Sequence, residues 1–347
     1  MNARPVRPPP ASRLSRWISA WAGIKAVVWG DFVLDEYWRC RSSRVSREAP
    51  VLVLDFESRS IQCGGAANAA LNLAALGARV FAVGWVGRDP HGRELRALLE
   101  NAGVTTAGLL EHFRGATVVK TRIVAGSSHT ARQQVVRVDR GSAFVATAGA
   151  RRSLLKALDR AARGARAVVL SDYGYDSVTP RLSRSRIRRW RARRAIVGLD
   201  ARYRLAEYHG VSIATPNESE AAHASGIGIA NERDLARAAA RLLRRLDARH
   251  LVITRGRDGL TLWNREASSL EAWGGREAVD VTGAGDAVVA AATLALAAGA
   301  PGIEAAALAN VAGSVAVSRR GAVAVSAGDL AAALKGKGRP RRARRRT

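Results

Sequence analysis

The stretch that decides the fold runs from Asp280 to Asp286, reads DVTGAGD, and directly precedes an Ala-rich apolar run that ends near Ala298. Small residues at the start of a predicted helix leave backbone N–H groups open, and the helix dipole adds positive potential there. Such a turn can bind a phosphate that carries developing negative charge. Asp286 could accept a proton from a hydroxyl group that attacks this phosphate. On spacing alone, a Gly-rich turn with a helix-start carboxylate is an equally good interpretation.

Outward from this motif, strand-like and helix-like segments alternate along the chain. Between residues 150 and 254, predicted helices alternate with short apolar strands such as Ala167 to Leu170. This alternation favours a mostly parallel sheet with helices on both faces. Two β-rich stretches, about 40–63 and 115–138, break the alternation and could pair as a small separate sheet, placed as a lid. The predicted class is therefore α/β, with a central mostly parallel sheet and a small β-sheet lid.

The composition is that of a globular protein. The chain has 347 residues, of which 48% are hydrophobic. Its longest apolar stretch, Ala287 to Ala300, is about 14 residues and too short to cross a bilayer, so we predict no membrane insertion. Two isolated cysteines, Cys40 and Cys63, lack metal-ligand spacing and predict a reducing, cytoplasmic location. The sequence has no GxxxxGK[ST] motif and no GxGxxG after its first strand, which argues against a P-loop kinase and a Rossmann dehydrogenase.

Cationic residues concentrate in two segments. The net charge is +27, and the segments Arg181–Arg194 and Lys335–Arg346 hold eight Lys or Arg residues each. A basic tail can bind nucleic acid through counterion release, but a solvated Arg-rich surface is the interpretation we favour. We predict a disordered N-terminal arm over residues 1–23, one domain over 24–332, and a basic disordered tail over 333–347.

Two glycine motifs in this order resemble the signatures of the ribokinase-like, or pfkB, sugar kinases. The first is Gly64 to Ala74 (GGAANAALNLA) and the second is the DVTGAGD stretch, and the resemblance covers roughly residues 24–332. It implies a ribokinase-like fold and in-line transfer of the γ-phosphoryl group of ATP to a sugar hydroxyl. It also implies that Asp286 is the catalytic base. The anion-binding turn would then consist of Gly283, Ala284 and Gly285.

Other segments are similar to those of bacterial D-glycero-β-D-manno-heptose-7-phosphate kinases. They are GDFVLDEYW at 30–38, SRVSREAP at 43–50, and the short runs KTR at 120–122 and LSDYG at 170–174. This resemblance implies phosphorylation of O1 of the heptose 7-phosphate, a step toward ADP-heptose and lipopolysaccharide core. The chain departs from it at Tyr175, where those kinases usually have Lys, so another sugar or sugar phosphate is the alternative. We find no HxGH-type adenylyltransferase motif and expect a monofunctional kinase.

The resemblance also implies which residues bind the sugar. Carboxylates and amides bind vicinal hydroxyls well, and glycine lets the backbone approach a sugar closely. A phosphate on the substrate needs cations far from the attacked O1, and an arginine can bind it in bidentate fashion. A turn-capping role for Asp31 and a surface ion pair of Arg44 with Glu48 are the structural alternatives. The predicted substrate-binding residues are Asp31, Asp35, Gly64, Gly65, Asn68, Arg44, Lys120 and Arg122.

The nucleotide side is predicted in the same way. Asn217 and Glu220 resemble an N-x-x-E motif that orders water around Mg²⁺, so Glu220 would act on the metal through water. A helix capping box is the structural alternative, and both roles can hold together. The predicted ATP-binding residues are Asn217, Glu220, Thr254, Arg255, Gly256 and Asn310. For Asn310, an ordinary helix-surface amide is an equally good interpretation.

The expected cofactors are ATP and Mg²⁺, with a monovalent cation as an open addition. The expected partners are the sugar phosphate, ATP and a second copy of the chain bound through the lid. A hypothesis of another class is a kinase-like scaffold that binds nucleic acid through its Arg-rich segments. The intact Asp286, Gly283 and Gly285 argue against a scaffold without activity.

Overall fold

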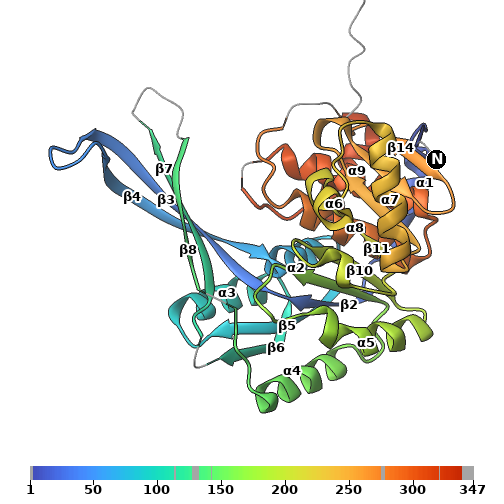
Figure 1. Ribbon diagram of the computed structural model, residues 1–347, viewed down its shortest axis with the longest axis horizontal. Coiled ribbons are helices and arrows are strands. Elements are labelled where there is room, and N and C mark those ends of the chain that lie inside the picture. Colours follow the sequence, from blue (N-terminus) through green and yellow to red (C-terminus); the bar gives the residue numbers. More distant parts are fainter. Residues whose placement is uncertain are drawn as a thin grey trace, which may run out of the picture.

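The computed structural model of the protein describes residues 3–112, 115–126, 133–141, 143–274, 278–319 and 321–337. Within these residues, one large sheet carries helices on both faces, and a second, smaller sheet projects from the body of the molecule (Figure 1). The predicted α/β class with a mostly parallel central sheet and a small additional sheet is confirmed.

The large sheet has ten strands in the described part of the chain. Neighbouring strands run parallel except where β13 pairs with β12 and with β14. From one edge to the other, the strands are β1 (Arg4–Pro5), β14 (Ala267–Leu270), β13 (Leu260–Trp263), β12 (His250–Thr254), β11 (Ile213–Ala214), β10 (Ile196–Ala201), β9 (Ala167–Asp172), β2 (Lys25–Gly30), β5 (Arg79–Gly87) and β6 (Thr105–His112).

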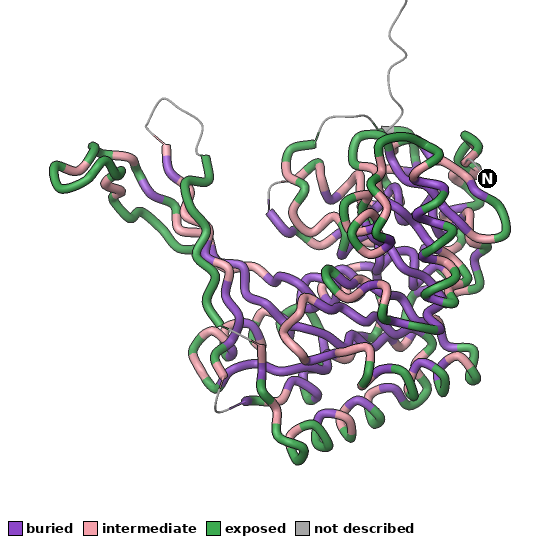
Figure 2. The backbone as a smooth tube through the Cα atoms, in the orientation of Figure 1, coloured by how far each residue is buried: buried purple, intermediate pink, exposed green. Residues whose placement is uncertain are grey.

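The helices cover both faces because the central strands are apolar on both sides. On β2, Ala26 and Val28 belong to one buried cluster, whereas Val27 and Trp29 belong to the other, as the alternation of side chains along a strand requires. Figure 2 shows the resulting buried interior along these strands. The longer helices are α1 (Ala11–Ala20), α2 (Ala66–Ala75), α3 (Pro90–Asn101), α4 (Ala148–Ala161), α5 (Pro180–Ala192), α6 (Glu218–Ser225), α7 (Glu232–Leu246), α8 (Ala284–Ala298) and α9 (Gly302–Val317). Shorter helical segments are α10 (Ala327–Ala332), η1 (Leu205–Glu207), η2 (Gly256–Asp258) and η3 (Ala333–Lys337).

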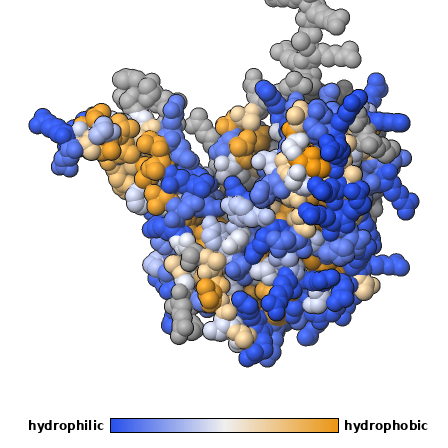
Figure 3. All heavy atoms as spheres, in the orientation of Figure 1, coloured by the Kyte–Doolittle hydropathy of each residue, from blue (hydrophilic) through white to orange (hydrophobic). Residues whose placement is uncertain are grey.

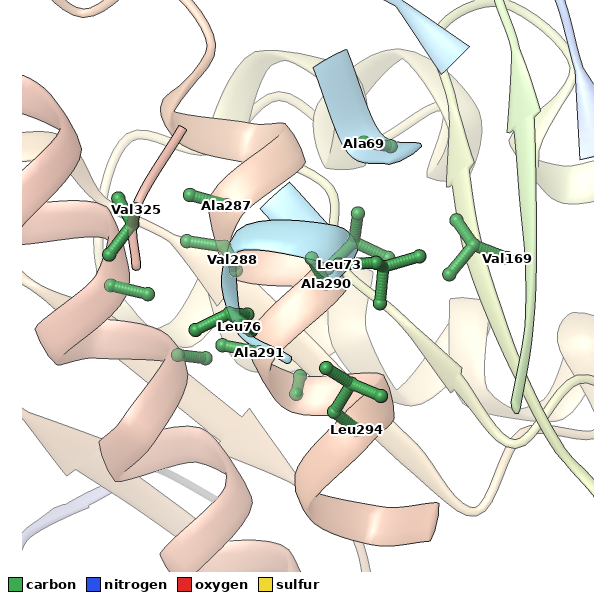
Figure 4. Packing of buried hydrophobic residues seen from close by; sticks show 14 of the residues in the cluster. Ala69, Leu73, Leu76, Val169, Ala287, Val288, Ala290, Ala291, Leu294 and Val325 are labelled. Carbon is green, nitrogen blue, oxygen red and sulfur yellow. The ribbon is translucent and has the colours of Figure 1, made fainter. Parts of the chain in front are cut away.

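Helices α2 and α8 pack against each other on one face of the sheet. Leu73 of α2 lies against Ala290 of α8 and toward Val169 of β9 (Figure 4). Alanines along both helices let their backbones approach closely, since no large side chain holds them apart. This packing places the first turn of α2 beside the first turn of α8, and both turns carry predicted site residues.

The smaller sheet is built from two long strands and two shorter ones. Its order is β4 (Leu52–Gly65), β3 (Phe32–Val45), β7 (Val118–Gly126) and β8 (Gln133–Arg140). Strand β3 is antiparallel to β4 and parallel to β7, and β7 is antiparallel to β8. The sheet begins at Phe32, earlier than the predicted boundary near residue 40, because β3 follows β2 after Asp31 alone. Part of the predicted lid, residues 127–132, lies outside the described residues.

The prediction of a disordered arm over residues 1–23 is wrong for its described part. Strand β1 pairs with β14, and helix α1 follows it. Leu14, Ile18 and Trp21 recur at helical spacing and are buried against the core, and Arg13 pairs with the buried Glu304 of α9. The segment is rich in proline and arginine, and its short amphipathic pattern was therefore not recognised as a helix. The apolar side of this helix packs against the core.

The structure describes all of the basic segment Arg181–Arg194 but only the first residues of Lys335–Arg346. In α5, Arg186 and Arg189 pair with Asp159 of α4, which fits a solvated helix surface. The predicted tail begins too early, because Ala333–Lys337 is helical and Leu334 is buried. The rest of the predicted tail, residues 338–347, lies outside the described residues. No helix in the described part of the chain is both long and apolar enough to cross a membrane.

Candidate active site

A cavity of about 420 Å³ lies at the carboxyl ends of the central strands and beside the start of α8. Ligand sites of open α/β sheets form at this edge, because the loops that follow the strands meet there. The structure brings most of the predicted nucleotide and catalytic residues to the wall of this one cavity. They are Asn217, Glu220, Thr254, Gly256, Gly283, Ala284, Gly285, Asp286 and Asn310.

The start of α8 has the geometry of an anion-binding turn. Gly283 precedes the helix with φ of 79°, a left-handed conformation that favours glycine. A Cβ atom at Gly283 would lie 2.5 Å from Asn68 Nδ2, whereas one at Gly285 would meet nothing within 4 Å. The backbone at Gly285 therefore borders open space. The first N–H groups of a helix lack intrahelical acceptors, so this turn can donate to a phosphate.

Asp286 is buried, and both of its carboxylate oxygens accept a hydrogen bond. Asn68 Nδ2 donates to Asp286 Oδ2 over 2.7 Å, and the Tyr173 hydroxyl lies 3.4 Å from Asp286 Oδ1. Burial raises the pKa of Asp286 to about 7, close to neutral pH. A carboxylate with this pKa can accept a proton, and Oδ1, which has the longer of the two contacts, is the oxygen better placed to do so.

Two further carboxylates line the same end of the cavity. Asp200 follows the core of β10, and the Tyr173 hydroxyl lies 3.5 Å from its Oδ2. Burial, followed by the charge of Asp286, raises the pKa of Asp200 well above its usual range, and burial also raises the pKa of Glu220. Sequence reasoning missed Asp200 and Tyr173, although their positions at strand ends were a usable signal.

Asn217 and Glu220 form the capping box of α6. Glu220 N–H donates to Asn217 Oδ1 over 2.8 Å, and Asn217 N–H donates to Glu220 Oε2 over 3.0 Å. The box uses Oε2 of Glu220, and Glu220 also lines the cavity. Among the described residues, no group of three or more His, Cys, Asp or Glu is arranged to hold a metal ion by itself.

Two predicted nucleotide contacts have a structural role as well. Arg255 is drawn into ion pairs with Glu218 and Glu232 and is not among the residues that line the cavity. Arg257, two residues later, lines it instead. The amide of Asn310 borders the cavity and donates to the Glu271 carbonyl oxygen over 2.6 Å.

The predicted sugar residues gather where the smaller sheet leaves the body. Asp35 is buried, and its Oδ1 accepts from Arg122 Nη1 over 2.6 Å, so Arg122 is held by this carboxylate. A Cβ atom at Gly64 would lie 2.5 Å from Asp35 Oδ2, which shows how closely β4 passes this group. Lys120 pairs with Asp35 in the sheet register, and burial lowers its pKa.

Asp31 lies beneath the loop that follows β9. Its carboxylate accepts hydrogen bonds from the backbone N–H groups of Tyr173, Tyr175 and Ser177, each at 2.8 to 2.9 Å. Burial raises the pKa of Asp31 to about 6. These three bonds occupy both of its oxygens, so its visible role is to shape the loop. Gly65, with φ of 55°, passes directly above the Asp31 carbonyl.

Arg44 is not brought to this site within one chain. It lies near the outer end of β3, where it is exposed. Nine residues separate it from Asp35 along the same strand, a distance of about 30 Å at roughly 3.3 Å per residue. Lys120, in contrast, lies next to Asp35 in the sheet register. Among the salt bridges of the described residues, none joins Lys120 to a carboxylate. Lys120 is therefore the better candidate for binding the phosphate of the substrate.

Residues 25–132 and 196–327, more than half of the chain, match the pfkB family of carbohydrate kinases. The chain belongs to this family. It is 40% identical over 309 residues to the bifunctional protein HldE of Geobacter metallireducens, covering 88% of this chain and 62% of that protein. The HldE protein of Azorhizobium caulinodans is 36% identical over 309 residues, with 88% and 63% covered. The chain thus spans less than two thirds of the length of these curated relatives.

Solved structures of pfkB-type kinases share the fold at lower identity. Arabidopsis thaliana ribokinase, solved in complex with ribose and ATP, is 19% identical with a TM-score of 0.70, covering 90% of this chain and 99% of that one. The tetrameric inhibited form of Escherichia coli phosphofructokinase-2 is 20% identical with a TM-score of 0.71, covering 91% and 100%. These structures show the fold, and the family match makes this chain a member of the pfkB carbohydrate kinases.

Proposed function

We propose that this pfkB kinase transfers the γ-phosphoryl group of ATP to O1 of D-glycero-β-D-manno-heptose 7-phosphate. The observation that carries the proposal is the place of Asp286. It lies at the start of α8, lines the cavity on one side, and contacts Asn68 of the sugar-binding motif on the other. The likeness to HldE proteins and the heptose-kinase-like segments around Asp35 and Lys120 support this substrate.

The chemistry follows from this arrangement. Asp286 takes the proton of the sugar hydroxyl as that oxygen forms a bond to the γ-phosphorus. The bond from the γ-phosphorus to the β–γ bridging oxygen breaks, and ADP leaves. The N–H groups at the start of α8 donate to the phosphoryl oxygens on which negative charge develops. Each group acts from a fixed position, because the helix and its capping glycine are built into the core.

The carboxylates at this end of the cavity fit a magnesium ion carried with ATP. Asp200 and Glu220 would hold it through water, since Mg²⁺ keeps several of its waters in kinase sites. When bound, Mg²⁺ neutralises charge on the phosphates. Dependence on a monovalent cation is a further part of the proposal and can be read in the same assays by replacing K⁺ with tetramethylammonium.

The distal phosphate of the substrate would meet the cations at the mouth of the sugar site. Lys120 Nζ lies 5.3 Å from the ring centroid of Tyr173 and 6.0 Å from that of Tyr175. Burial lowers the pKa of Lys120, while the charges of Asp35 and Asp139 raise it and those of Arg202 and Arg137 lower it. Arg137 is paired with Asp139, so Lys120 is the cation that we assign to the distal phosphate.

The test is turnover of ATP against a panel of heptose, hexose and pentose phosphates together with their unphosphorylated sugars. We expect the heptose 7-phosphate to give the highest kcat/KM and the product to carry phosphate at O1. Asp286→Asn is the control for contaminating kinases, because it keeps the shape of the site. Equal turnover of phosphorylated and unphosphorylated sugars would contradict the assignment, and a preferred pentose or hexose would replace the substrate.

We also propose that two copies associate through the smaller sheet. Phe56, Val136 and Val138 are 60%, 45% and 44% exposed. The register places them on the face that carries Glu36, opposite the face of Asp35. Figure 3 shows apolar side chains gathered on this projecting sheet. Exposed apolar patches of this kind are characteristic of association sites, and a second copy presents the same patch.

A further inference from the structure

A chain of hydrogen bonds leads from the backbone near the C-terminal end of the domain to Asp286. Val325 N–H donates to Asn72 Oδ1 over 3.0 Å. Asn72 Nδ2 donates to Asn68 Oδ1 over 3.2 Å and to the Asn68 carbonyl over 2.9 Å. Asn68 Nδ2 then donates to Asp286 Oδ2 over 2.7 Å. Asn72 and Asn68 are one helical turn apart on α2, and both are buried.

The Val325 N–H group fixes the donor-to-acceptor direction of this series of hydrogen bonds. A backbone N–H can only donate, so the amide of Asn72 must present its oxygen to Val325. Its NH₂ group then faces Asn68, which must present its own oxygen in return. The NH₂ group of Asn68 is thereby turned toward Asp286. The orientation of the Asn68 amide is thus fixed by hydrogen bonds that begin at the backbone of Val325, two steps away from Asn68.

We propose that Asn72 is a positioning residue for catalysis, which locks the amide of Asn68 so that it donates to Asp286. The locked amide occupies Oδ2, so Oδ1, whose contact with the Tyr173 hydroxyl is longer at 3.4 Å, is the oxygen that receives the substrate proton. Without Asn72, the Oδ1 atom of Asn68 loses its donor, and only the contacts of its NH₂ group with Asp286 Oδ2 and with the Gly283 carbonyl oxygen hold the amide. A buried amide oxygen without a donor is unfavourable, so the amide shifts from the position in which it donates best to Asp286.

The segment that begins this chain also contacts two other parts of the site. Gly321 N–H donates to Asp280 Oδ2 over 2.9 Å, at the start of the DVTGAGD motif. Ala322 N–H donates to Gln62 Oε1 over 3.0 Å, on strand β4 of the smaller sheet. The backbone from 321 to 325 therefore joins the base, the phosphate-binding turn and the sheet above the sugar. Asn72 connects this segment to Asn68, which contacts the base.

The test is a double-mutant cycle on kcat with Asn72→Leu and Asn68→Leu. We expect Asn72→Leu to lower kcat by about 10- to 100-fold and to leave KM for ATP within about twofold. In the Asn68→Leu background, Asn72→Leu should cause no further loss, because its target is gone. Independent losses that multiply in the double variant, or a kcat for Asn72→Leu within about twofold of the parent, would overturn the proposal.

Two additions keep the result interpretable. Leu73→Val, at the next and fully buried position of α2, is the control for lost packing, and we expect a lower melting temperature with kcat nearly unchanged. Asn72→Ser, which is smaller but polar, replaces Asn72→Leu if that variant does not fold. The proposal rests on Asp286 as the base. The cycle uses whichever sugar the panel prefers, so a wrong sugar assignment and a failure of Asn72 give different results.

Discussion

At the scale of single residues, the surroundings of Asp286 suit it to the proposed role of base. Burial makes its ionised form less favourable, while the amide of Asn68 and the hydroxyl of Tyr173 partly restore it. The balance leaves a pKa of about 7, high enough for the carboxylate to hold a proton and low enough for it to be ionised at neutral pH. A solvent-exposed aspartate would be a much weaker base.

The first prediction removes this base. Asp286→Asn keeps the size and the hydrogen-bonding shape of the side chain but cannot accept the sugar proton. We expect kcat to fall by about 10²- to 10⁴-fold, with the fold and sugar binding retained. Steady-state kinetics with circular dichroism and a binding titration measure all three quantities. Turnover within a few-fold of the parent would exclude Asp286 from the role of base.

The second prediction concerns pH. As the proposed base, Asp286 would act in its ionised form, and its pKa is about 7. We therefore expect kcat/KM to fall below that pH and to level off above it. The charged groups near it act in both directions, since Asp35 raises its pKa and Lys120 lowers it. A rate profile from about pH 5.5 to about pH 9 measures the acid limb, with an expected slope of about tenfold per pH unit. A flat profile across neutrality would contradict this assignment.

The third prediction separates the two candidate cations of the smaller sheet. Lys120→Ala should raise KM for the sugar phosphate about tenfold or more and leave KM for ATP nearly unchanged, because a charge-assisted hydrogen bond contributes about 1.5–3 kcal/mol. Arg44→Ala is the matched control, since Arg44 is exposed far along β3 from Asp35. If both substitutions raised KM for the sugar phosphate equally, the position of Lys120 near Asp35 within one chain would not explain which cation binds the phosphate.

Residues within one motif were predictable, and contacts between distant segments were not. The glycines before Asp286 and the pair Asn217 and Glu220 are local patterns, and the structure brings them to one cavity. The position of Asp200 depends on which strands are neighbours in the sheet. The direction of Arg255 depends on two acidic partners that lie elsewhere in the chain, Glu218 and Glu232. The spacing of residues in the sequence shows neither which strands are neighbours in the sheet nor which distant side chains form ion pairs.

At the scale of elements, the packing of α2 on α8 is what assembles the site. Alanines fill most of this contact, so the two helix starts come close enough for Asn68 to reach Asp286. The alternation of strands and helices predicted these elements well because each has its own periodicity. It did not predict α1, because the apolar residues Leu14, Ile18 and Trp21 are too few to indicate a helix until their packing against the core is known.

The fourth prediction tests association through the smaller sheet. Phe56→Glu combined with Val138→Glu places two like charges on each copy of the exposed apolar face. We expect the parent to be a dimer by light scattering and the variant to be a monomer, because burying unpaired carboxylates is strongly unfavourable. Val145→Glu, at an exposed apolar residue away from this sheet, is the control. An unchanged mass for the double variant would place any interface elsewhere.

At the scale of the whole molecule, the positive charge has more than one role. The arginines of α5 lie on a helix surface, where Arg186 and Arg189 pair with Asp159 of the neighbouring helix. The residues beyond Lys337 add six arginines to a net charge of +27. Long-range attraction of anionic substrates depends on the summed charge, whereas turnover depends on the few groups around Asp286.

The last prediction concerns these terminal residues. Truncation after Lys337 keeps the buried Leu334, which an earlier truncation after Ala333 would remove from the core. We expect kcat to stay within about twofold of the parent, because the pfkB match ends at residue 327 and the cavity is lined by residues before it.

If the full chain binds duplex DNA nonspecifically, losing six arginines should weaken that binding and lower the slope of log affinity against log salt by up to about 5. Salt titrations of both proteins with one duplex measure the slope, and the kinase assay is run on the same preparations. A large loss of turnover in the truncated protein would instead mean that the terminal residues complete the active site. An unchanged slope would place nonspecific contacts on the folded surface, where the arginines of α5 are the first to test.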